Sequence, residues 1–210
     1  MLVTVLANAL VLDIIDRLAV IRLDPRLISL VGTFGETLRE ELRRLYPQAK
    51  ITNDARNVDL VIASMSLPFC EDPTAMLQHF QKQLRPGGIL LLSALGPDTF
   101  RELPKECGLS AKLYDMHDIG DALVAAKFSG PVLDVEEIVL AYRDEKKLLA
   151  EIKSSAMITG NLKRGQLKPD ETGRYTLTVE VIYAHAFRGD AREDDYGEVR
   201  VPIQKIVRPS

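Results

Sequence analysis

Cysteine and histidine are scarce in this chain of 210 residues, which has two cysteines and three histidines. Cys70 and Cys107 lie far apart in the sequence, so they lack the close pairing of zinc ligands and of disulfide frameworks. His79, His117 and His185 likewise lack the spacing of metal ligands. The sequence therefore predicts no metal site, and it predicts free thiols of the kind found in a reducing compartment.

The chain also lacks an excess of positive charge, because 27 basic and 30 acidic side chains give a formal net charge of -3. Proteins that bind nucleic acids gain affinity by neutralising phosphates, so this balance disfavours a nucleic-acid partner. Long apolar runs are missing too. The apolar segment 1–23 is interrupted by charges such as Asp13 and Arg17, which predicts neither a membrane span nor a signal peptide. We therefore expect a cytoplasmic protein with no membrane partner.

The composition is that of an ordinary globular protein, with 46% hydrophobic and 27% charged residues. A chain of this length can form one sizeable core, and no internal repeat or low-complexity tract divides it. The sequence predicts a single domain over residues 1–210. We expect a helix within residues 1–24 and a tail or edge strand within residues 188–210.

Short runs of branched apolar residues alternate with segments of helical periodicity along the chain. The runs predict buried strands, and the periodic segments between them predict crossover helices. This alternation predicts an α/β fold with a doubly wound, mostly parallel sheet. The predicted strands cover residues 26–31, 49–52, 58–64, 89–94, 131–140 and 175–187, and the predicted helices after the first cover residues 36–45, 73–84, 118–126 and 145–157.

One long segment is similar to a known family. Residues 84–103, LRPGGILLLSALGPDTFREL, resemble the strand-five region of the biotin-pathway malonyl-acyl-carrier-protein O-methyltransferases. The RPGG turn before an apolar strand is common to methyltransferases of this class. The segment LGPDTFREL is much more specific, because it resembles this one family. Residues 67–73, 116–128 and 173–187 resemble further segments of the family in the same order, which extends the resemblance over most of residues 58–187.

The resemblance implies a sheet that ends in an antiparallel strand, the cofactor S-adenosyl-L-methionine (AdoMet), and methyl transfer to the carboxylate of malonyl-carrier protein. In such folds the cofactor lies across the carboxyl ends of the strands. A glycine turn there lets the backbone approach the cofactor, and an acidic side chain binds the ribose hydroxyls. This chain departs from the family there: Val31 and Thr33 stand in place of glycines, and Ser29 stands in place of an acid. Only residues 48–57 lie between Pro47 and Val58, where the family has a strand, a helix and a further strand, so we expect one strand and one helix to be missing.

Five residues are candidates for the cofactor site. Gly32 and Gly35 match the remnant of the glycine loop, although the same pattern also suits a simple turn between strand and helix. Asp54 is the candidate ribose-binding carboxylate, and an ordinary turn residue is the alternative. Ser64 and Met65 follow a buried strand at the edge where such folds bind ligands.

Substrate candidates lie further along the chain. Phe69 is a candidate pocket residue, and Tyr142 and Arg143 are catalytic candidates that follow a predicted strand. A bidentate contact from Arg143 would hold a substrate carboxylate, and a solvent-exposed arginine is the alternative. Clustered lysines suit either an acidic carrier protein or plain solvation: Lys146, Lys147 and Lys153.

Three functions are consistent with these observations. The first is a homologue of the family with weakened or lost AdoMet binding, which acts as a non-catalytic or regulatory protein and forms a homodimer. The second is an active carboxyl O-methyltransferase whose substrate is malonyl-carrier protein or a similar small carboxylic acid. The third is a carrier-protein binding module.

Overall fold

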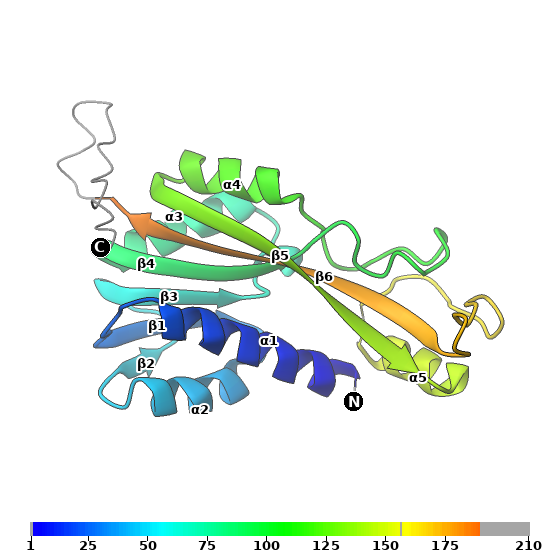
Figure 1. Ribbon diagram of the computed structural model, residues 1–210. Helices are drawn as coiled ribbons and strands as arrows, with labels where there is room; N and C mark the ends of the chain where they lie inside the picture. Colours follow the sequence, from blue (N-terminus) through cyan, green and yellow to red (C-terminus); the bar gives the residue numbers. More distant parts are fainter. Residues whose placement is uncertain (1, 156, 190–210) are drawn as a thin grey trace, which may run out of the picture.

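A computed structural model describes residues 2–155 and 157–189 of the chain. Within them, all six predicted strands form one sheet in the order β2-β1-β3-β4-β6-β5 (Figure 1). The strands are Leu27–Gly32 (β1), Lys50–Thr52 (β2), Val58–Ser64 (β3), Leu84–Leu95 (β4), Phe128–Tyr142 (β5) and Tyr175–Arg188 (β6).

Helices cover both faces of this sheet, which confirms the doubly wound prediction. Residues of α1, α2 and α5 join one hydrophobic core, and residues of α3 and α4 join a second core on the opposite face. Both cores share β3 and β4, whose side chains alternate between the two faces. The helices are Leu2–Val20 (α1), Gly35–Leu45 (α2), Pro73–Gln83 (α3), Met116–Ala125 (α4) and Glu145–Ser155 (α5), with a short 3-10 turn at Leu67–Phe69.

The four strands β1 to β4 run parallel, and β6 lies antiparallel between β4 and β5. This confirms the antiparallel end of the sheet that the family resemblance implies. At the other end, β2 has only three residues and is followed directly by a turn and β3. Residues 53–57 hold no helix or strand, so the sheet ends at β2 and the expected shortening is present.

β5 and β6 continue past the ends of the parallel strands as a two-stranded arm (Figure 1). The pairing of β6 with β4 stops at Leu95 and Val181, whereas its pairing with β5 continues to Tyr142 and Tyr175. We call residues 137–142 and 175–180 the β5–β6 arm. Its far end meets α5, so α5 lies well away from the edge where β1 and β3 end.

Two local features differ from or add to the sequence predictions. The turn predicted at residues 85–88 lies within β4, where Gly87 has φ of 71° and the pairing with β3 shifts register. Asp72 caps α3, because its carboxylate accepts a hydrogen bond of 2.9 Å from the backbone nitrogen of Ala75. The edge strand expected within residues 188–210 lies outside the described residues beyond Gly189.

In the described part of the chain, Cys70 and Cys107 are free. No helix there has both the length and the apolar character that crossing a membrane requires.

Candidate functional site

The turn after β1 is built around Gly32. This residue has φ of 106°, and a Cβ atom on it would lie 1.8 Å from the carbonyl oxygen of Ser64. The next backbone nitrogen, that of Thr33, donates a hydrogen bond of 2.9 Å to the same oxygen. Only glycine permits this conformation and this approach of the ends of β1 and β3.

A cavity of about 350 Å³ lies where β1 and β2 end, beside the start of α2. Its volume is near the lower end of the range for small-molecule pockets. Phe34, which precedes α2, has φ of 62° and offers no side-chain cap to the helix. The structure thus brings Gly32 and Gly35 together in one cavity, which is lined by Leu30, Val31, Gly32, Gly35, Glu36, Arg39 and Asn53.

Arg39 forms a fixed, charged part of this cavity wall. Its guanidinium donates hydrogen bonds of 3.2 Å to the carbonyl oxygen of Ile51 and 2.6 Å to Oδ1 of Asn53. Its Nε lies 3.9 Å from a carboxylate oxygen of Glu36, and only 17% of its side chain is exposed. The sequence analysis did not identify Arg39, although its position four residues after Gly35 places both on one side of α2.

Asp54 does not line the cavity. Its Oδ1 accepts a hydrogen bond of 2.6 Å from Nε2 of Gln83 and lies 3.9 Å from Nε2 of His79, both on α3. Gln83 is buried, and its Oε1 accepts a hydrogen bond of 3.3 Å from the hydroxyl of Ser29. Asp54 therefore interacts with α3 on the opposite face of the sheet from α2 and Arg39.

Ser64 and Met65 lie in the protein interior at the carboxyl end of β3, next to Gly32. Met65 has φ of 50°, and its backbone nitrogen donates hydrogen bonds of 3.1 Å and 3.2 Å to the carbonyl oxygen and the hydroxyl of Ser93. The Ser64 hydroxyl has no hydrogen-bond partner among the described residues. A left-handed φ at a residue other than glycine costs free energy and is common at ligand-binding edges.

The substrate candidates lie elsewhere. Phe69 is 55% exposed and does not line the cavity at β1. Tyr142 and Arg143 line a second hollow of about 430 Å³ at the far end of the β5–β6 arm. The arm thus separates these two residues from Gly32 and Gly35. The residues that line this hollow are Val139 to Asp144, Lys147 and Glu151.

Tyr142 acts as a hydrogen-bond donor in this hollow. Its hydroxyl donates to Oε2 of Glu151 over 3.0 Å. Burial and the Glu151 carboxylate both raise the pKa of the Tyr142 phenol above its ordinary value. The phenol therefore keeps its proton at neutral pH, which makes it unsuited to act as a general base.

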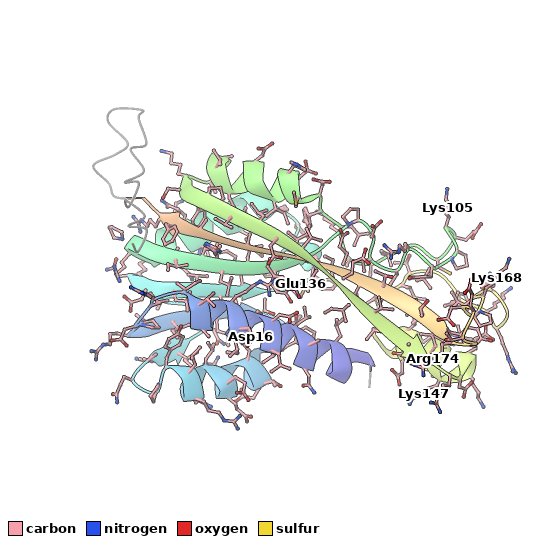
Figure 2. All side chains as sticks on the ribbon, in the orientation of Figure 1. Asp16, Lys105, Glu136, Lys147, Lys168 and Arg174 are labelled. Atoms are coloured by element: carbon pink, nitrogen blue, oxygen red, sulfur yellow. The ribbon has the colours of Figure 1, made fainter. Side chains whose placement is uncertain are left out.

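A polar cluster that the sequence analysis did not identify joins α1 to the sheet. The hydroxyl of Tyr183 donates a hydrogen bond of 2.8 Å to Asp13, and the guanidinium of Arg17 lies 3.7 Å from the centre of the Tyr183 ring. Arg17 also contacts Asp134 at 2.7 Å and Glu136 at 2.8 Å, and Figure 2 shows Glu136 close to α1. Burial raises the pKa of Asp13, and the hydrogen bond from Tyr183 opposes this shift. The cluster holds α1 against β5 and β6.

Among residues 2–155 and 157–189, no three His, Cys, Asp or Glu side chains are placed to hold a metal ion.

Known proteins resemble this chain at the level of sequence. Malonyl-[acyl-carrier protein] O-methyltransferase 1 of Coxiella burnetii is 35% identical over 176 residues, which cover 73% of this chain and 62% of that protein. The malonyl-[acyl-carrier protein] O-methyltransferase of Laribacter hongkongensis is 34% identical over 183 residues, which cover 72% of this chain and 61% of that protein. The chain is a homologue of these methyltransferases. It spans about three fifths of their length.

A third relative is aligned over almost all of this chain. The malonyl-[acyl-carrier protein] O-methyltransferase of Legionella pneumophila is 27% identical over 252 residues, which cover 93% of this chain and 88% of that protein. This alignment is longer than the chain, which has 210 residues. The Legionella protein therefore has segments that are missing here. No protein-family model matches the chain.

Solved structures support the fold. A putative methyltransferase from Bacillus halodurans matches with a TM-score of 0.57 and 14% identity, covering 85% of this chain and 99% of that one. A SAM-dependent methyltransferase from Archaeoglobus fulgidus matches with a TM-score of 0.52 and 11% identity, covering 86% of this chain and 94% of that one. The chain thus has the Rossmann-like fold of these proteins.

Proposed function

We propose that this chain is a methyltransferase homologue of the biotin-synthesis type in which AdoMet binding is weakened or lost. It would then act as a non-catalytic or regulatory protein. The observation that carries this proposal is the position of Asp54, whose carboxylate interacts with Gln83 and lies outside the lining of the cavity at β1.

The side chains around the cavity do not fit AdoMet. Val31 is one of the lining residues, and it carries a side chain where the family has a glycine. The Arg39 guanidinium is held in the wall by Ile51 and Asn53, so this side chain fills part of the space at the end of β1. Each lost hydrogen bond to the ribose costs roughly 0.5–1.5 kcal/mol, and two or three such losses weaken binding by between about fivefold and about a thousandfold.

One observation favours an active enzyme as the alternative. Gly32 and Gly35 meet in a cavity of about 350 Å³, which is within the range of ligand pockets. Methyl transfer to a carboxylate depends mainly on the alignment of the two reactants, because the acceptor is already ionised. If AdoMet binds, an O-methyltransferase that acts on malonyl-carrier protein or a similar acid becomes the better proposal.

A carrier-protein binding module is the third candidate. The homologues are named for malonyl-[acyl-carrier protein], and three exposed lysines on α5 would attract an acidic carrier: Lys146, Lys147 and Lys153.

Isothermal titration calorimetry with AdoMet and S-adenosylhomocysteine tests the main proposal. We expect no heat of binding at AdoMet concentrations up to about millimolar. The Legionella homologue in the same buffer serves as the positive control. Micromolar dissociation constants that are lost in the Asp54→Ala variant would contradict the proposal and would favour the active enzyme.

A further inference from the structure

β5 is a long edge strand with one neighbour. It is the last strand of the sheet (Figure 1) and, among the described residues, pairs only with β6. Along its 15 residues, every second backbone N–H and C=O group points away from β6. Natural proteins shorten, charge or cover such an edge, because an open edge pairs readily with another strand. A strand of this length therefore favours a cover.

The edge exposes apolar side chains. Three valines of β5 are 53%, 39% and 55% exposed: Val132, Val135 and Val139. Because side chains alternate along a strand, Val132 lies on one face of β5, and Val135 and Val139 lie on the other. Apolar side chains on a neighbouring strand would cover valines on both faces at once. The occupant that fits this edge is therefore a strand with apolar residues of its own.

The charges beside the middle of β5 do not balance. Two arginines each contact two carboxylates there: Arg17 contacts Asp134 and Glu136, and Arg101 contacts Asp98 and Glu137. The side chains of the three acids on β5 are 54%, 44% and 43% exposed. An occupant with an excess of positive charge would therefore complement this edge.

The sequence that follows β6 has both properties. β6 ends at Arg188, which pairs with Phe128 at the start of β5. Residues 198–208 read EVRVPIQKIVR, which contains one acid, three basic residues and five branched apolar residues. Branched apolar residues favour strands. This segment thus combines apolar strand-forming residues with a net positive charge.

The connection from β6 is long enough to reach the edge. A strand added beside β5 would lie two strand spacings, about 10 Å, from β6. Residues 189–197 can span about 30 Å when extended, and they begin and end with glycine. Because this connection starts beside the first residues of β5, a strand that follows it along the edge would run parallel to β5.

The single proline of the segment is compatible with this pairing. Successive residues of a strand direct their backbone groups to opposite sides. If Val199, Val201 and Ile203 direct their backbone groups to β5, Pro202 faces solvent, where its missing N–H is not needed. Prolines of edge strands occupy such positions.

We propose that residues 198–208 pair with the free edge of β5 as an added strand, parallel to β5. The backbone pairing would satisfy the edge, and the segment would cover the exposed valines. Its basic residues would lie along the acids of β5: Arg200, Lys205 and Arg208. This assignment does not depend on AdoMet binding.

Hydrogen exchange of single amides in the full chain, measured by NMR, tests this. Among residues 132–140 of β5, alternate amides bond to β6 and serve as an internal control, and the others face the edge. We expect the edge-facing amides to be protected in the unmodified chain. Ile203→Pro removes an N–H that the added strand directs to β5, and it should speed their exchange at least about tenfold.

Gln204→Pro is the matched control for Ile203→Pro. Residue 204 is two positions after Pro202 and has the same outward orientation, so Gln204→Pro should leave the exchange of the edge-facing amides unchanged. Circular dichroism melting of both variants checks that the rest of the chain stays folded. Calorimetry with AdoMet reports separately on the proposed function.

Three results would overturn the proposal. Edge-facing amides of the unmodified chain that exchange as fast as unpaired amides would mean that no strand covers β5. Equal exchange in the two proline variants would mean that residues 198–208 do not pair with the edge in this orientation. Protection that rises with protein concentration, together with self-association in sedimentation velocity, would assign the edge to a second copy of the chain.

Discussion

The two sides of the sheet have been preserved to different degrees. On one side, β2 has three residues and leads directly into β3. On the other, β5 and β6 have 15 and 14 residues and pair along most of their length. The fold tolerates the loss of a strand and a helix beyond β2, because both hydrophobic cores are centred on β3 and β4. The shortened side is also the one that holds the cavity at β1, so the proposed weakening of AdoMet binding concerns the side of the sheet that has lost elements.

The largest loss of stability should come from a substitution in the centre of the sheet, where β3 and β4 belong to both cores. Ile62 of β3 is fully buried, and Ile62→Ala should reduce the free energy of unfolding by roughly 2–5 kcal/mol. Ile51→Ala in β2 removes the same atoms from a partly exposed position and should cost much less. Urea denaturation measures both. Equal losses would mean that β2 contributes to stability as much as the centre, which would remove the contrast between the two regions.

A second pair of variants tests the turn at the cavity. Gly32→Ala adds a Cβ atom 1.8 Å from a backbone oxygen at a positive φ, and the φ alone should cost roughly 1–3 kcal/mol. Gly35→Ala meets no atom within 4 Å and should be close to neutral. Thermal and urea unfolding compare the two. If Gly32→Ala is as stable as Gly35→Ala, the close contact between β1 and β3 is not required.

The polar cluster of Asp13, Arg17 and Tyr183 under α1 should contribute an intermediate, pH-dependent amount to the free energy of unfolding. Tyr183→Phe removes the hydrogen bond to Asp13 and should cost roughly 1–3 kcal/mol at neutral pH. Because burial raises the pKa of Asp13, stability from this group is present at low pH and is lost as pH rises above the ordinary value of 3.8. The variant removes the hydrogen bond that lowers this pKa, so its loss of stability with rising pH should be steeper. Urea denaturation from pH 3 to pH 7 measures both slopes, and parallel slopes would contradict the assignment.

The smallest expected effect concerns recognition on the β5–β6 side. Replacement of Lys146, Lys147 and Lys153 with glutamate should slow association with an acidic carrier protein and flatten its salt dependence. These side chains are exposed, so stability should change little. Stopped-flow association at several salt concentrations measures the rate. An unchanged association rate would mean that these lysines do not take part in carrier recognition.

The positions of the strands and helices followed from local patterns. The apolar run at residues 58–64 fits a strand buried on both faces, and β3 has these bounds. The segment at residues 84–103 indicated the family, and the sequence relatives agree. The short distance between α2 and Val58 left no room for another strand and helix. These features depend on residues close together in the chain, so the sequence alone specifies them.

The arrangement of the side chains at the candidate site could not be predicted from local sequence patterns. Asp54 follows a strand, as a ribose-binding acid should, but the turn directs its carboxylate toward Gln83, 29 residues away. Arg39 occupies the cavity wall because α2 packs beside β2, and Tyr142 lies far from Gly32 because β5 is the outermost strand. The sequence determined which segments form the sheet, since apolar periodicity is a local property of the chain. Only the tertiary structure decided which side chains share a cavity, because strand order and turn direction depend on contacts between distant residues.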